Sequence, residues 1–150
     1  MISIVRTGSN NPDFLKLVSE LDKELWATYG EAQAGYAPHN KIKTTLPTVL
    51  IYENDIPIGC GCFKDFDNKS VEIKRMFTLN EHRGKGIAAK VLAELEAWAK
   101  EKNYSYTVLE TGTLQHAAVY LYRKLGYTDI EKYGPYVDKE QSICMRKELK

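Results

Sequence analysis

The chain has 150 residues, a length typical of one domain that buries a core without disulfides or a structural metal. Its 21 Lys and Arg residues nearly balance its 20 Asp and Glu residues, which argues against a dedicated nucleic-acid binder, because such proteins carry an excess of basic residues. No apolar run approaches the roughly 20 residues that span a bilayer, and the N-terminus lacks the pattern of a signal peptide. We therefore expect a single domain over residues 1–150 in the cytoplasm, without a membrane or nucleic-acid partner.

The three cysteines are Cys60, Cys62 and Cys144. The Cys-x-Cys spacing of the first two differs from the Cys-x-x-Cys spacing of zinc and redox sites. Residues two apart on a strand share one face, so we expect Cys60 and Cys62 to be small buried residues in a reducing compartment. We predict no metal site.

The first half of the chain predicts a short strand, a long helix and three further strands. Asn10 or Asn11 before Pro12 is typical of a helix start, and apolar residues then recur at helical spacing until Gly30. The segment 31–47 is ambiguous and holds either a second short helix or a long loop. The strands are expected at 2–5, 48–52, 56–66 and 70–79, the last three as an antiparallel meander.

The strand 70–79 predicts strict alternation, with Val71, Ile73, Arg75 and Phe77 on one face. Glu72 would then lie on the opposite face together with Lys74, Met76 and Thr78.

The second half of the chain changes period. Apolar residues at helical spacing follow Gly86, and a second such set ends before Gly126, a typical helix stop. The expected elements are a helix from 87 to 99, a strand at 106–109, a helix at 115–125, and short strands near 127–132 and 142–148. This order predicts an α+β domain with a mixed sheet.

The segment from Thr78 onwards predicts an anion site. A strand ends, a short loop carries Arg83-Gly84-Lys85-Gly86-Ile87-Ala88, and a helix begins at once. Glycines let the backbone approach a ligand, and a helix N-terminus offers free N–H groups suited to a pyrophosphate. Arg83 and Lys85 can add positive charge. Taken alone, the loop is equally compatible with a structural turn that carries two solvated basic residues, and it matches neither the Walker nor the dinucleotide spacing.

Two motifs together resemble the GNAT superfamily of acetyl-CoA-dependent N-acetyltransferases. The loop Arg83-x-x-Gly86-x-Ala88 resembles its pyrophosphate signature, and residues 118–127, Ala-Val-Tyr-Leu-Tyr-Arg-Lys-Leu-Gly-Tyr, resemble a second family element. The resemblance implies a mixed, mostly antiparallel central sheet flanked by about four helices, with acetyl-CoA as the cofactor. Gln115 departs from the Asn that the family often has there, which leaves its contact with the cofactor arm open.

The resemblance also implies residues that contact acetyl-CoA. The strand that precedes the loop splays from its neighbour in the family and offers main-chain N–H groups to the cofactor. The cofactor-binding candidates are therefore Met76, Phe77, Thr78, Arg83, Gly84, Lys85, Gly86, Ile87, Ala88 and Gln115.

Acetyl transfer to an amine needs a general base, a donor to the oxyanion and a general acid. Glu72 is the candidate base, because several family members carry a catalytic Glu at the matching position, and Glu110 is the rival. Each could instead be an ordinary structural or exposed carboxylate. Tyr122 is the candidate acid, since a phenol can donate a proton to a thiolate within reach; a core tyrosine is the alternative.

The acceptor amine is expected near aromatic and polar residues, because aromatic faces can hold a cation. The substrate-binding candidates are Tyr29, Gln33, Tyr36 and Tyr133, and His39 and Asn40 lie in the same first segment. We expect direct transfer to a primary amine of a small molecule or a peptide terminus. The alternatives are a non-catalytic acyl-CoA-binding module and an unrelated ATP binder. The strand 142–148 could offer an exposed edge for a homodimer.

Overall fold

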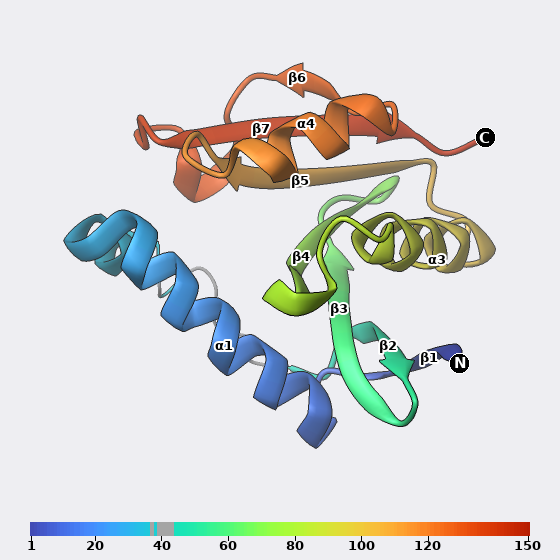
Figure 1. Cartoon of the computed structure of the whole chain (residues 1–150). Coiled ribbons are helices and arrows are strands. Elements are labelled where there is room, and N and C mark those ends of the chain that lie inside the picture. The colour runs from blue at the N-terminus through green and yellow to red at the C-terminus, as the bar shows by residue number, and fades with distance from the viewer. Residues whose placement is uncertain (37, 39–43) are drawn as a thin grey trace. The chain divides into compact units, whose positions relative to one another are not determined.

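The computed structural model describes residues 1–36, 38 and 44–150. By its internal contacts the chain divides into two compact units. The first unit comprises residues 1–63 and 74–95, and the second comprises residues 64–73 and 96–150. Among the described residues, seven strands are hydrogen-bonded in the order β1-β2-β3-β4-β5-β7-β6 (Figure 1). Strands β3 and β4 and helix α3 contribute residues to both units.

The first unit is built from β1 to β3, the end of β4, and two helices. Strand β1 (Ile2–Gly8) pairs antiparallel with β2 (Pro47–Glu53), which pairs antiparallel with β3 (Ile56–Asp65). Helix α1 (Pro12–Tyr29) begins as expected, with the Asn11 side chain accepting a hydrogen bond from the Asp13 N–H at 2.8 Å. The ambiguous segment after it begins with the 3₁₀-helix η1 (Gly30–Gly35).

Two helices cover opposite faces of β3 in this unit. Phe14, Leu17 and Leu21 of α1 pack with Cys60 and Cys62 in a buried cluster, which confirms that the two cysteines share a buried face. The glycines between and beside them lie on the other face. A Cβ atom on Gly59 would lie 2.5 Å from Cγ2 of Ile87, the first residue of helix α3 (Ile87–Glu101). A glycine at this position therefore allows the start of α3 to lie close against β3.

Strand β4 (Ser70–Thr78) does not alternate as expected. Val71, Glu72 and Ile73 are all buried, and Arg75 adopts a left-handed backbone with φ of 60°. This conformation interrupts the strand, since non-glycine residues rarely adopt it within β-structure. The Arg75 side chain is buried and pairs with Asp22 of α1, and that ion pair accompanies the irregular backbone.

The second unit holds the start of β4 and the C-terminal elements. Residues 70–73 of β4 run parallel to β5 (Tyr106–Gly112), whereas β5 pairs antiparallel with β7 (Ser142–Glu148) and β7 with β6 (Thr128–Ile130). Helix α4 (His116–Lys124) follows β5. Short 3₁₀-helices η2 (Asn80–His82), in the first unit, and η3 (Gly134–Tyr136), in the second, complete the described elements.

Two expectations are corrected. The described residues hold three α-helices, whereas about four were expected. Strand β7 has β5 on one side and β6 on the other, with residues 144–146 paired to β6. The prediction that this strand offers an open edge for dimerisation is therefore wrong over those residues. The α+β class and the mixed, mostly antiparallel sheet are confirmed.

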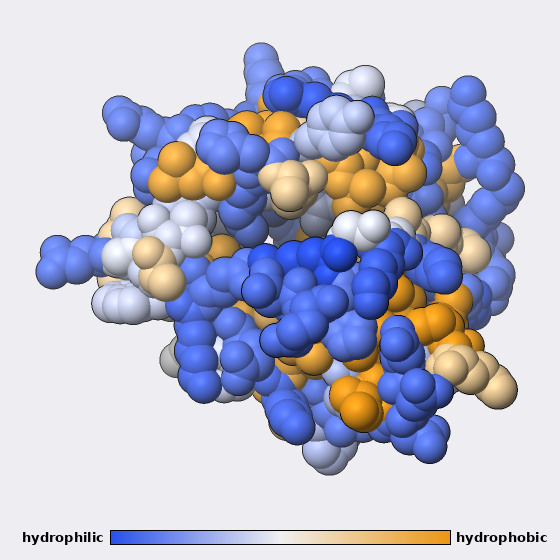
Figure 2. Space-filling model, viewed as in Figure 1, coloured by the Kyte–Doolittle hydropathy of each residue, from blue (hydrophilic) through white to orange (hydrophobic). Residues whose placement is uncertain are grey.

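Hydrophilic residues cover most of the face shown in Figure 2, and hydrophobic residues show there in smaller patches. Exposed large apolar side chains include Leu15, Trp26 and Tyr120. Among the described helices, none combines the length and the apolar character needed to cross a membrane.

Adjacent residues of α1 allow a test of the core of the first unit. Phe14 is fully buried, whereas Leu15 is 54% exposed. Phe14→Ala is expected to lower the free energy of unfolding by about 3–5 kcal/mol, because it leaves a cavity among packed side chains. Leu15→Ala in the same helix is expected to change it by about 0.5 kcal/mol or less. Urea unfolding of both variants measures the difference, and equal losses would contradict the packing of α1.

Candidate functional site

The candidate cofactor loop lies in the first unit, between η2 and α3. Gly84 and Gly86 both have φ of 79°, and a Cβ atom on either would meet no other atom within 4 Å. These glycines are therefore needed for backbone conformation, and the space beside them is open for a ligand. The backbone N–H groups of the first turn of α3 begin directly after Gly86, and Lys85 is exposed.

Arg83 connects this loop to its surroundings. Its Nε donates a hydrogen bond to the Thr78 carbonyl at 2.9 Å, and its Nη2 donates to the Glu24 carboxylate of α1 at 2.6 Å. The guanidinium also lies 5.5 Å from the ring centroid of Phe77. Arg83, the arginine expected to bind the cofactor, is thus paired with the carboxylate of Glu24. The pair is exposed, and exposed ion pairs contribute little to stability.

The end of β4 also offers a buried polar atom. The Thr78 hydroxyl is buried and has no hydrogen-bond partner among the described residues. Buried polar groups in proteins nearly always have a partner. This unpartnered hydroxyl and the open glycine loop lie at the two ends of the segment 78–86, where the cofactor is expected.

The candidate base lies in the second unit. Glu72 is only 4% exposed, and its Oε2 accepts a hydrogen bond of 2.8 Å from the Tyr133 hydroxyl. Its Oε1 lies 3.9 Å from Nζ of Lys64, an exposed cation at the end of β3. Sequence reasoning placed Tyr133 with the acceptor-binding residues and did not consider Lys64, because no local spacing links these residues to Glu72.

The rival base lies on the same face of the sheet. Glu72 is paired in register with Val108 of β5, and Glu110 follows two residues later. Since alternate residues of a strand share a face, both carboxylates point to one side. Glu110 accepts a hydrogen bond of 2.7 Å from the Ser142 hydroxyl and is paired in register with Cys144. The two candidates thus belong to one polar cluster.

Tyr122, the candidate acid, is buried in α4. Burial raises the pKa of its phenol above the ordinary value, and the charge of Glu110 raises it further. The hydroxyl therefore keeps its proton through the neutral range and can donate it. Tyr120, two residues earlier, is exposed, as its different helical face predicts.

The other candidates fall into two groups. Gln115 caps α4, and its Oε1 accepts a hydrogen bond of 3.0 Å from the Gly112 N–H, so its carbonyl oxygen already has a partner within the loop. Tyr29 ends α1, Gln33 lies buried in η1, and Tyr36 directly follows η1. His39 and Asn40 lie outside the described residues.

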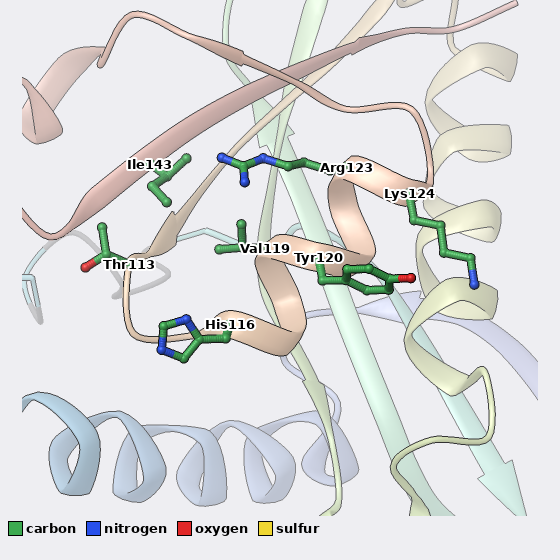
Figure 3. Close-up of a pocket in the computed structure, with 7 residues that line it drawn as sticks. All are labelled: Thr113, His116, Val119, Tyr120, Arg123, Lys124 and Ile143. Carbon is green, nitrogen blue, oxygen red and sulfur yellow. The ribbon is translucent and has the colours of Figure 1, made fainter.

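A pocket of about 740 Å³ also opens beside α4 in the second unit (Figure 3). Basic, aromatic and apolar side chains line it, namely Thr113, His116, Val119, Tyr120, Arg123, Lys124 and Ile143. Arg123 is paired with Asp129 at 2.8 Å. The sequence did not predict this pocket, because it depends on how Ile143 of β7 lies beside the helix.

Comparison with known proteins identifies the family. The model of the acetyltransferase (GNAT) family matches residues 12–127, a range that includes the loop, the start of β4 and α4. The chain belongs to the GNAT family. It is therefore an acetyltransferase of a family that uses acetyl-CoA, as the resemblance implied.

Individual relatives agree with this assignment. The chain is 29% identical over 150 residues to an IAA acetyltransferase of Azospirillum brasilense, covering 99% of this chain and 98% of the relative. It is 34% identical over 100 residues to an uncharacterized N-acetyltransferase of Bacillus subtilis, covering 65% and 66% of the two chains.

Solved structures show the same GNAT fold. A Klebsiella pneumoniae protein with a provisional acyl-CoA N-acyltransferase assignment has a TM-score of 0.83, with 29% identity and coverage of 100% and 99%. A GNAT acetyltransferase of Elizabethkingia anophelis, solved with acetyl-CoA bound, has a TM-score of 0.72, with 22% identity and coverage of 99% and 98%.

The glycine loop generates a binding prediction. Gly86→Ala is expected to weaken acetyl-CoA binding by about tenfold. The left-handed backbone conformation costs a residue with a side chain about 1–2 kcal/mol, so the loop is expected to leave the conformation that binds the cofactor. Gly30→Ala is the matched control, since Gly30 also has positive φ and open space. Calorimetric titration with acetyl-CoA measures both. Equal affinities in the two variants would argue against this loop as the cofactor site.

Proposed function

We propose that residues 1–150 form one N-acetyltransferase domain that moves acetyl directly from acetyl-CoA to a primary amine of a small molecule or a peptide terminus. The observation that carries this proposal is Glu72, a buried carboxylate on β4 that a tyrosine hydroxyl holds. It lies on β4, four residues before Met76, the first of the three cofactor-binding candidates on that strand. Acetyl-CoA supplies the activated acetyl group.

Each residue has a proposed task. The loop from Arg83 to Ala88 and the backbone of Met76 to Thr78 hold the cofactor, and Arg83 exchanges Glu24 for a phosphate. Glu72 takes a proton from the acceptor ammonium, so that the amine becomes a nucleophile. Tyr122 donates a proton to the departing thiolate. No covalent enzyme intermediate is required when the amine and the thioester are held side by side.

The acceptor site is proposed at the tyrosine-rich segments. Tyr29, Gln33 and Tyr36 supply two aromatic rings and an amide within one short stretch, a set that suits a small polar cation. The near-balanced charge of the chain favours a small amine or a peptide terminus as the acceptor over a long basic protein tail.

The first experiment measures thiol release from acetyl-CoA across amino acids, dipeptides, polyamines, aminoglycosides, N-terminal peptides and IAA, the compound in the name of the Azospirillum relative. Glu72→Gln is expected to lower kcat by about 100-fold or more with its best acceptor, since general base catalysis contributes about 10²–10⁴-fold. Glu110→Gln is the matched control on the same face. If Glu110→Gln shows the larger loss, the base is Glu110.

A panel without turnover would have a separate meaning. If acetyl-CoA binds and no amine is acetylated, the acyl-CoA-binding module becomes the better interpretation. If acetyl-CoA does not bind, the assignment of residues 83–88 as the cofactor site is wrong.

The acid is tested by a pair of tyrosines on one helix. Tyr122→Phe is expected to lower kcat by about 10–100-fold with little change in KM, because it removes a proton donor that acts late in the reaction. In the native chain this donor stays protonated well above neutral pH, since its pKa is raised by burial and by Glu110. Tyr120→Phe, exposed on the same helix, should leave kcat unchanged. A similar loss in both variants would point to an effect on the helix.

A further inference from the structure

The hydroxyl of Tyr133 is directed at a carboxylate. It donates to Oε2 of Glu72 across 61 residues of sequence, and both residues belong to the second unit. Burial raises the pKa of this phenol far above its ordinary value, and the charge of Glu72 adds to the effect. Tyr133 therefore stays protonated and remains a donor over the whole range in which carboxylates and amines titrate.

Two aromatic rings hold the Tyr133 ring in place. Phe66, after the end of β3, makes an edge contact with centroids 4.7 Å apart, and Tyr136 of η3 makes another at 5.8 Å. Tyr136 is itself buried. Edge-to-face contacts of this kind favour one ring orientation, so the phenol oxygen is fixed relative to Glu72 from two sides.

The two oxygens of Glu72 have different surroundings. Oε2 accepts the Tyr133 hydrogen bond, whereas Oε1 faces the exposed ammonium of Lys64 at 3.9 Å. A cation that is half exposed can move away or be replaced by another ammonium. The geometry thus separates an oxygen that is held by the protein from an oxygen that can meet an amine.

We propose that Tyr133 is a positioning residue of the transferase reaction, holding Oε2 of Glu72 so that Oε1 is directed to take the acceptor proton. The proposal rests on Glu72 as the base in the proposed function. It gives Tyr133 a role that acts through Glu72, in place of the direct acceptor contact expected from the sequence.

Other charged and titratable groups also face this carboxylate. Lys64 of β3 places a cation beside it, and Glu110 of β5 places a second carboxylate on the same face. Burial raises the pKa of the Cys144 thiol of β7, and the charges of both carboxylates raise it further. Replacing the Tyr133 hydroxyl leaves these groups in place, so a change in the variant reports the hydrogen bond.

The test compares Tyr133→Phe with Tyr104→Phe over a range of pH. Tyr104 also donates its hydroxyl to a carboxylate, that of Asp65, and lies in the same unit. A hydrogen bond to a charged group contributes about 1.5–3 kcal/mol, and losing it corresponds to a shift of about one to two pH units in the titration of that group. In Tyr133→Phe the acid limb of kcat/KM is expected to move to higher pH by that amount, with kcat recovering at high pH. Tyr104→Phe should keep the native profile.

The outcomes separate this proposal from its foundation. If Tyr133→Phe raises KM equally at every pH and leaves the acid limb in place, Tyr133 binds the acceptor and the proposal is overturned alone. If Glu72→Gln keeps full activity, the base is misassigned and both proposals fail.

A second measurement needs no acceptor. The ¹³C signal of the Glu72 side-chain carboxyl, identified by its loss in Glu72→Gln, is followed against pH in the native chain and in Tyr133→Phe. The pH of its transition is expected to rise by about one to two units in the variant. Transitions at the same pH in both chains would overturn the proposal, whatever amine is acetylated.

Discussion

The interior of a protein admits an ionised carboxylate only when other groups replace the lost water. Glu72 meets this requirement with a hydroxyl donor on one oxygen and a cation beside the other. Its partners come from the end of β3 and from the segment before η3. The environment of Glu72 is therefore made by segments outside β4, and the register of β4 with β5 also brings Glu110 to the same face as Glu72.

The cofactor loop has a different physical basis. It depends on backbone conformation, with glycines at positive φ before α3 and a glycine in β3 that lets the start of α3 lie close. Arg83 is held by an exposed carboxylate and a carbonyl, and exposed ion pairs of this kind contribute little to stability. Such a cation can exchange its partner for a phosphate at low cost. The guanidinium of Arg75, two residues before Phe77, is instead buried, and separating it from the exposed carboxylate of Asp22 would leave a buried charge without its partner.

Membership of the GNAT family accounts for the fold and the use of acetyl-CoA, but the acceptor has to be argued from the site, because one fold supports many substrates. The relatives and the solved structures share between 22% and 34% identity with this chain in the comparisons above. The residues that hold Glu72 come from loops and strand ends, which vary more than the elements that they connect. Tyr133, Phe66 and Lys64 lie in segments of this kind.

By itself, the sequence determined the features that short segments encode. The cap of Asn11 before Pro12, the glycines of the Arg83 loop and the helical spacing of α3 and α4 each depend on neighbours within a few residues, so periodicity and turn chemistry reveal them. Only the tertiary structure decided the left-handed backbone of Arg75, the position of β7 between β5 and β6, and the hydrogen bond from Tyr133 to Glu72. These features depend on contacts between residues that are far apart in the chain. Such contacts leave no periodic pattern in either segment, because the partners come together only when the chain folds.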